Sequence, residues 1–125
     1  MNRKPLPQEP QPLTPPVFHI LLALVGEERH GYGIMLDIAK QTDGDLQLGP
    51  GTLYGCLKRM LAAGLIEESD ERPDPDLNDE RRRYYRLKPL GECTVRAEAE
   101  RIATALAAAK SKRVFAGGTH NASAI

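Results

Sequence analysis

The chain has 125 residues, of which 41% are hydrophobic and 27% are charged, with equal numbers of basic and acidic side chains. This length fits one small domain with a single core. The two cysteines lie far apart and the three histidines are scattered, which excludes a zinc ribbon or a disulfide scaffold and predicts neither a metal nor a cofactor.

Residues 1–16 contain six of the ten prolines, which remove amide donors and favour polyproline II. We expect a flexible arm there, without any packed element. Residues 17–25 are almost entirely apolar and predict a short buried helix that ends at Gly26. This run is too short to span a bilayer and follows no basic signal region, so we expect neither a membrane protein nor a secreted one, but a cytoplasmic location.

Two further helices follow. Residues 31–33 open an amphipathic stretch that ends near Asp43 and Gly44. After residues 49–51, helical spacing predicts a third helix closed by Gly64, whose apolar stripe consists of Leu53, Tyr54, Leu57, Met60 and Leu61. The opposite face is small and basic, with Cys56 and Lys58 on its flanks. It presents Thr52, Gly55, Arg59 and Ala62.

A hairpin is predicted next, with strands at residues 65–66 and 83–87 and a long loop at residues 69–80. Residues 67–80 hold eight acids and one arginine, whereas residues 81–88 hold five cations and no acid. Such blocks predict separated faces or a self-paired hairpin. We expect at least one cross-hairpin ion pair, between Arg81, Arg82 or Arg83 and Glu67, Glu68 or Asp70.

Pro89 then begins a fourth helix, at a position where a missing amide costs nothing. Its apolar residues recur in heptad spacing, at Val95, Ala99, Ile102, Leu106 and Ala109. The three helices and the hairpin already supply one core, so this seam predicts a homodimer. The alternative is that the seam packs on its own domain. Residues 114–125 are expected to form a flexible tail.

Several short motifs occur in a fixed order, at residues 30–33, 51–54, 64–66, 82–87 and 89–91. This ordered set resembles the PadR family of transcriptional regulators, and the short C-terminal part resembles its compact subgroup with a single last helix. The resemblance implies a mainly helical α+β fold. A winged helix-turn-helix would occupy residues 17–88 and a dimerisation helix residues 89–113. Where the family usually has Thr before the last helix, this chain has Lys88, which removes a hydroxyl cap.

The resemblance further implies a sequence-specific DNA-binding regulator, a repressor, which binds a pseudo-palindromic operator in double-stranded DNA as a homodimer. A small aromatic effector near the dimer interface is also implied. For Tyr32 and Tyr54 the alternative is packing within the protein's own core. The expected DNA contacts are Tyr32, Gly51, Thr52, Tyr54, Lys58, Arg59, Arg81, Arg82 and Arg83.

Two other classes of function would require features of their own. A winged-helix module that binds protein rather than DNA would need an exposed apolar patch on the wing. An enzyme would need a nucleophile beside a base, a glycine-rich phosphate loop after a strand, or a metal cluster, and the sequence offers none, so we predict no catalytic residues. His30 is expected to be a turn residue, and Cys56 a small helix-face side chain without a redox role.

Overall fold

The computed structural model describes residues 13–73 and 81–116, without the side chains of residues 71–73 and 81. The arm at residues 1–12, the hairpin tip at residues 74–80 and the tail at residues 117–125 lie outside the described residues. The expectations of flexibility stated for these segments therefore stay predictions.

Proline begins three of the four helices, α1 (Pro15–Ala23), α3 (Pro50–Ala62) and α4 (Pro89–Ser111). Proline is tolerated in the first helical turn because the amide it lacks would have no partner there. The expectation that no element forms before residue 17 was therefore wrong for Pro15 and Pro16, which form the first turn of α1.

Helix α2 (Gly31–Gln41) begins differently, because the side chain of His30 caps it by accepting a hydrogen bond from the Gly33 amide. Its C-terminal side is closed by a turn in which Asp43 and Gly44 both have positive φ. Gly64, which follows α3, has a φ of 78°, a conformation that side chains with a Cβ rarely adopt. The predicted ends of both helices are thus confirmed.

The β-hairpin, which forms the wing, has longer strands than predicted. Strands β2 (Ile66–Pro73) and β3 (Arg81–Leu87) pair antiparallel, with an irregularity in register between Glu68 and Glu71. Part of the predicted loop is therefore strand. A further strand, β1 (Arg29–His30), pairs with β3 and gives the sheet order β1-β3-β2, so the expectation that His30 is a turn residue was wrong.

The core lies where α1, α2, α3 and the sheet meet, and α4 adds one residue to it. Fully covering such an aliphatic side chain is worth about 1.5–3 kcal/mol. The largest fully buried side chains are Ile20, Leu21, Ile34, Ile38, Leu53, Leu57 and Ile66.

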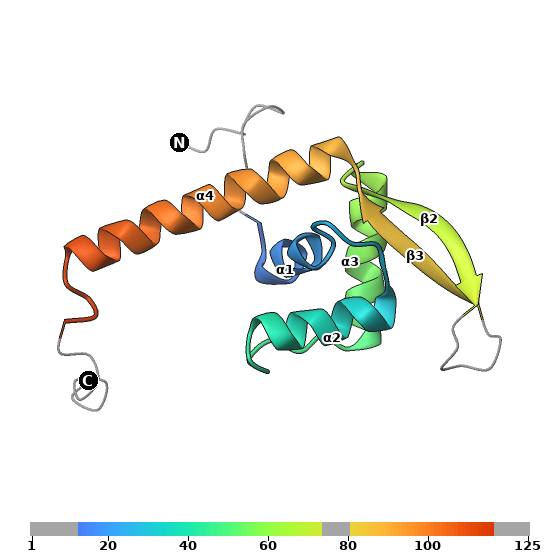
Figure 1. Ribbon diagram of the computed structural model, residues 1–125, viewed down its shortest axis with the longest axis horizontal. Helices are drawn as coiled ribbons and strands as arrows, with labels where there is room; N and C mark the ends of the chain where they lie inside the picture. Colours follow the sequence, from blue (N-terminus) through green and yellow to red (C-terminus); the bar gives the residue numbers. More distant parts are fainter. Residues whose placement is uncertain (1–12, 74–80, 117–125) are drawn as a thin grey trace, which may run out of the picture.

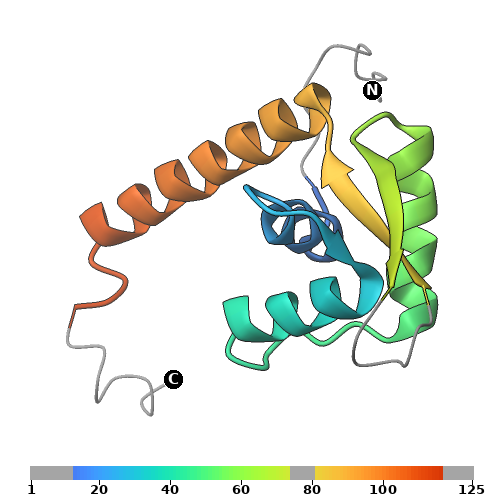
Figure 2. The same cartoon turned by 45° about the vertical axis from the view of Figure 1, so that its right-hand side comes forward.

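Two parts of the molecule project from the helical core in opposite directions (Figure 1). The wing extends at one end, beside the start of α2, and α4 runs past α1 at the other. Figure 2 shows the same arrangement: the C-terminal half of α4 extends away from the other helices. Among the described residues, no helix combines the length and apolarity needed to cross a membrane.

Candidate nucleic-acid interface

Helix α3 divides into a buried face and an exposed one. Leu53, Leu57 and Met60 are buried as predicted. The prediction was wrong at the two edges of the apolar stripe, where it placed Tyr54 inside the stripe and Cys56 outside it. Cys56 is 3% exposed, whereas Tyr54 is 49% exposed. Successive residues turn by about 100°, so these two side chains occupy opposite edges of the stripe, and the core covers the Cys56 edge.

The exposed face of α3 contains the predicted contacts of this helix. Gly51 and Thr52 lie exposed in its first turn, and that turn carries no acidic residue. Lys58 is exposed one turn and a half later. The Arg59 guanidinium folds back along the helix, with Nη2 3.4 Å from the Cys56 Sγ. It adds positive charge beside the first half of the helix, where the first amides have no partner within the helix.

Tyr54 connects α3 to the beginning of α2. A Cβ atom built on Gly31 would lie 2.8 Å from Tyr54 Cζ and closer still to the hydroxyl oxygen, so only glycine fits there without displacing the phenol. Tyr54 thus combines the two alternatives left open for it: half of the side chain is exposed, while its hydroxyl end packs on α2.

The wing reaches the same region through Arg82. Its Cζ lies 5.3 Å from the centroid of the Tyr32 ring, an arrangement in which the ring face attracts the cation. Its Nη1 lies 3.2 Å from His30 Nδ1, and the His30 ring meets the Tyr84 ring edge-on, with centroids 5.2 Å apart. The guanidinium therefore packs against Tyr32 in the first turn of α2 and against His30, which caps that turn.

Arg83 and Arg86 of the wing pair with acids. Arg83 Nη1 lies 3.1 Å from Glu68 Oε2, which confirms the prediction of a cross-hairpin ion pair. Arg86 Nε donates to Glu67 Oε2 at 2.8 Å, and this bond, with the nearby charge of Glu67, raises the pKa of Arg86. The side chain of Arg81 is outside the described residues.

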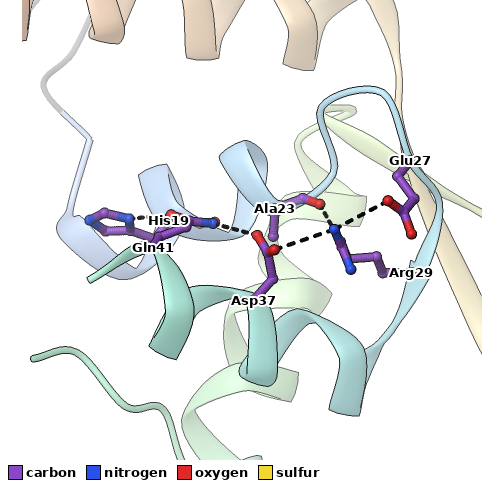
Figure 3. A network of polar contacts seen from close by, with 6 residues as sticks. All are labelled: His19, Ala23, Glu27, Arg29, Asp37 and Gln41. Carbon is purple, nitrogen blue, oxygen red and sulfur yellow. Dashed lines mark hydrogen bonds and ion pairs between the residues drawn. The ribbon is translucent and has the colours of Figure 1, made fainter. Parts of the chain in front are cut away.

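A polar network sets α2 against α1 (Figure 3). Arg29 donates through Nε to the carbonyl oxygen of Ala23 at 2.7 Å and pairs through Nη2 with Asp37 Oδ1 at 3.3 Å. Gln41 donates through Nε2 to Asp37 Oδ2 and to the His19 carbonyl oxygen, and accepts from His19 Nδ1. The network ties the backbone of α1 to side chains of α2. It thereby holds α2, including its first turn, in a fixed orientation relative to α1. Sequence reasoning missed it.

A comparison with protein-family models matches residues 20–97 to the transcriptional regulator PadR-like family. That match covers more than half of the chain. The chain belongs to the PadR-like family of transcriptional regulators. A family of regulators, rather than of enzymes, agrees with the prediction that the chain is not an enzyme. A search of the curated proteins found no match to this chain.

Solved structures show where this PadR-like fold recurs. A transcriptional regulator from Clostridium thermocellum superimposes with a TM-score of 0.63 at 24% identity, over 77% of this chain and 87% of that one. A PadR family transcription regulator from Clostridium difficile gives 0.61 at 25%, over 77% and 95%. Bacillus subtilis PadR, solved in complex with operator DNA, gives 0.56 at 18%, over 65% and 44%. These likenesses confirm the predicted winged helix-turn-helix.

In this PadR-like chain the predicted seam of α4 splits into two parts. Val95 is 7% exposed and belongs to the chain's own core. Ile102 and Leu106 are 45% and 44% exposed, and Ala99 is exposed as well. Ala109 is half-buried. The first residue of the seam thus anchors α4 to the domain, whereas the following large side chains extend beyond it.

A cavity of about 560 Å³ lies between the end of α1 and the first half of α4. Its apolar lining includes Leu22, Val25 and Val95, and charged side chains that include Glu28 and Arg86 complete it. Among the described residues, no group of three or more metal-ligating side chains comes together.

Proposed function

We propose that this PadR-like protein binds double-stranded DNA in a sequence-specific way, as a homodimer, and represses transcription. The observation that carries the proposal is the juxtaposition at one end of the molecule. The exposed first turn of α3, free of acids, lies beside the first turn of α2, onto which Arg82 of the wing folds. Bacillus subtilis PadR, which shares this fold, was solved with operator DNA.

The residues have different roles in this proposal. Thr52 and the amides around Gly51 meet base edges or phosphates in the major groove, because a helix end presents unpaired donors there. Tyr32, Tyr54, Lys58, Arg59 and the wing arginines Arg81, Arg82 and Arg83 contact the backbone, with the wing arginines alongside or in the minor groove. Arg83 would exchange its pairing with Glu68 for phosphate.

The exposed part of α4, with Ile102 and Leu106, supports the proposed homodimer. Two copies of α3, the recognition helix of each subunit, would enter successive major grooves about 34 Å apart under two-fold symmetry, so the operator would be pseudo-palindromic. Such a dimer would exclude other proteins from the DNA it covers, which favours repression. Because its partner is DNA, the protein would act in the cytoplasm.

We also infer a small aromatic effector, which would enter the cavity between α1 and α4. Its apolar lining suits a flat apolar ring system, and the charged side chains beside it could orient one polar substituent. A thermal-shift screen of flat aromatic compounds tests this part. A compound that binds the folded protein alone raises the unfolding temperature, by an amount that grows with the logarithm of its concentration above the dissociation constant.

The main experiment measures binding to a duplex selected by the purified protein from a random pool, at increasing salt concentration. The net charge is zero, so binding must depend on a local basic face that displaces counterions, and affinity should fall steeply with salt. Lys58→Ala should reduce the logarithmic slope by about 0.9. Lys40→Ala is the matched control, because this exposed lysine lies at the far end of α2.

A response that is flat in salt would instead favour a protein-binding module. The structure gives that alternative little support. None of the large exposed hydrophobic side chains lies on the described parts of β2 and β3; they lie on or beside the helices.

A further inference from the structure

We propose that His30 is a positioning residue, which orients the Arg82 guanidinium of the wing for a phosphate of the DNA backbone. This inference rests on the proposed function and assigns His30 a role within the same interface. The imidazole does not itself contact DNA in this proposal. It links the first turn of α2 to β3 and limits where the guanidinium can lie.

The hydrogen bonds determine the tautomer of His30. The Gly33 amide can only donate, and it lies 3.0 Å from Nδ1, so this nitrogen carries no proton. Arg82 Nη1, 3.2 Å from the same nitrogen, is also a donor under all conditions. The two donors therefore share the single lone pair of Nδ1, and the proton of the neutral ring is on Nε2.

Two aromatic rings complete the arrangement. Tyr32 places its ring face against the Arg82 guanidinium, 5.3 Å from ring centroid to Cζ. Tyr84 meets the imidazole edge-on, and it is the residue opposite His30 in the pairing of β1 with β3. The backbone register thus holds the imidazole in place, and the imidazole and the Tyr32 ring restrict the guanidinium. A long, flexible side chain is partly ordered before DNA arrives.

The location of this cluster connects it with the recognition helix. Gly31 follows His30 directly, and its Cα faces the hydroxyl end of Tyr54 on α3. The restrained guanidinium therefore packs on the same first turn of α2 that contacts Tyr54 of α3. A phosphate that passes between wing and helix would meet a cation that is already oriented.

A double-mutant cycle on duplex binding tests the proposal. His30→Ser keeps a side-chain cap for the Gly33 amide but is too short to hold Arg82. His30→Asn keeps an acceptor near the position of Nδ1 and serves as the conservative variant. We expect His30→Ser to weaken binding to the selected duplex roughly three- to ten-fold, and His30→Asn to restore most of this loss. In an Arg82→Ala background, His30→Ser should change the affinity little.

The outcomes separate this proposal from the function on which it rests. If the losses from His30→Ser and Arg82→Ala multiply independently, or if His30→Asn binds as poorly as His30→Ser, the positioning role is overturned. If Arg82→Ala binds normally while Lys58→Ala does not, the positioning role fails and the proposed function stands. If the unaltered protein binds no duplex, both fail. Chemical denaturation of each variant completes the test, because a merely structural role would lower stability in step with affinity.

Discussion

Gly91, in the first turn of α4, lies against the backbone carbonyl group of Leu65, in the turn between α3 and β2. A Cβ built on Gly91 would lie 3.1 Å from the Leu65 carbonyl carbon and closer still to its oxygen. The same oxygen accepts a hydrogen bond from the Lys88 amide at 3.0 Å. The Lys88 side chain makes no cap, as the absence of a hydroxyl at this position predicted. The backbone contact with Leu65 therefore anchors the start of the helix.

Gly91→Ala should therefore lower the free energy of unfolding by about 1–3 kcal/mol, because backbone atoms cannot move aside as a side chain can. The measurement is chemical denaturation. Gly55→Ala is the matched control in α3, since a Cβ there meets nothing nearer than the tip of Arg59, at 3.6 Å. Gly55→Ala should raise the free energy of unfolding by up to about 1 kcal/mol, because alanine has the higher helix propensity. Equal effects for the two variants would contradict the packing argument.

Ile102→Glu combined with Leu106→Glu should produce a monomer, because the two exposed side chains supply the apolar part of the proposed dimer interface. Operator binding should fall roughly 100-fold, since one half-site then binds without the other. Sedimentation measures the assembly. Thr104→Glu with Ala108→Glu has the same spacing on the opposite face of α4 and should leave a dimer. If the dimer survives the first pair of substitutions, the interface must lie on another surface, of which Phe18 and Leu22 on α1 are the first candidates.

Stability should fall at alkaline pH through Tyr85. Burial, and then the negative charge of Glu68, raise the pKa of this phenol above its usual value of 10.0. The folded state holds the proton more tightly than the unfolded chain. The stabilisation is therefore complete below about pH 10 and is lost as the pH rises through the folded-state pKa. Denaturation midpoints measured between neutral and strongly alkaline pH should show this loss.

Two variants identify the group responsible. Tyr85→Phe should flatten the alkaline decline, and Glu68→Gln should make it smaller and complete it at a lower pH, because the second cause of the shift is removed. An unchanged profile in both variants would assign the decline to another group.

Gln41→Ala should lower the free energy of unfolding by about 1–2 kcal/mol, because the amide group makes three partly buried hydrogen bonds, two to His19 on α1 and one to Asp37 within α2. Gln47→Ala is the control, since Gln47 is exposed and its side chain donates to the Gly44 carbonyl oxygen, three residues away in the same turn. Thermal unfolding compares the two. If both lose the same amount, the network does not fix the two helices together.

The helices could be predicted because their signals are local. Prolines mark the starts of three of them, and glycines with positive φ follow α1 and α3. The periodicity of α3 gave the direction of its buried face but not which edge of the stripe the core covers. That choice depends on α2, where Gly31 leaves room for the Tyr54 hydroxyl.

The part of the site around His30 could not be predicted for a related reason. Strand β1 has only two residues, and its pairing with β3 joins positions more than fifty residues apart. No local pattern reports such a pairing. The contact of Arg82 with Tyr32 depends on that pairing, so the sequence indicated both residues separately as DNA contacts and not as one cluster.

The two faces of α3 have a consequence for how such a regulator can be changed. The buried face contributes Leu53, Leu57 and Met60 to the core, whereas Thr52 and Lys58 face outward. Most substitutions at exposed positions of this kind alter stability by less than about 0.5 kcal/mol. The outward positions can thus be randomised as a library, and altered operator preference selected, without first rebuilding the fold.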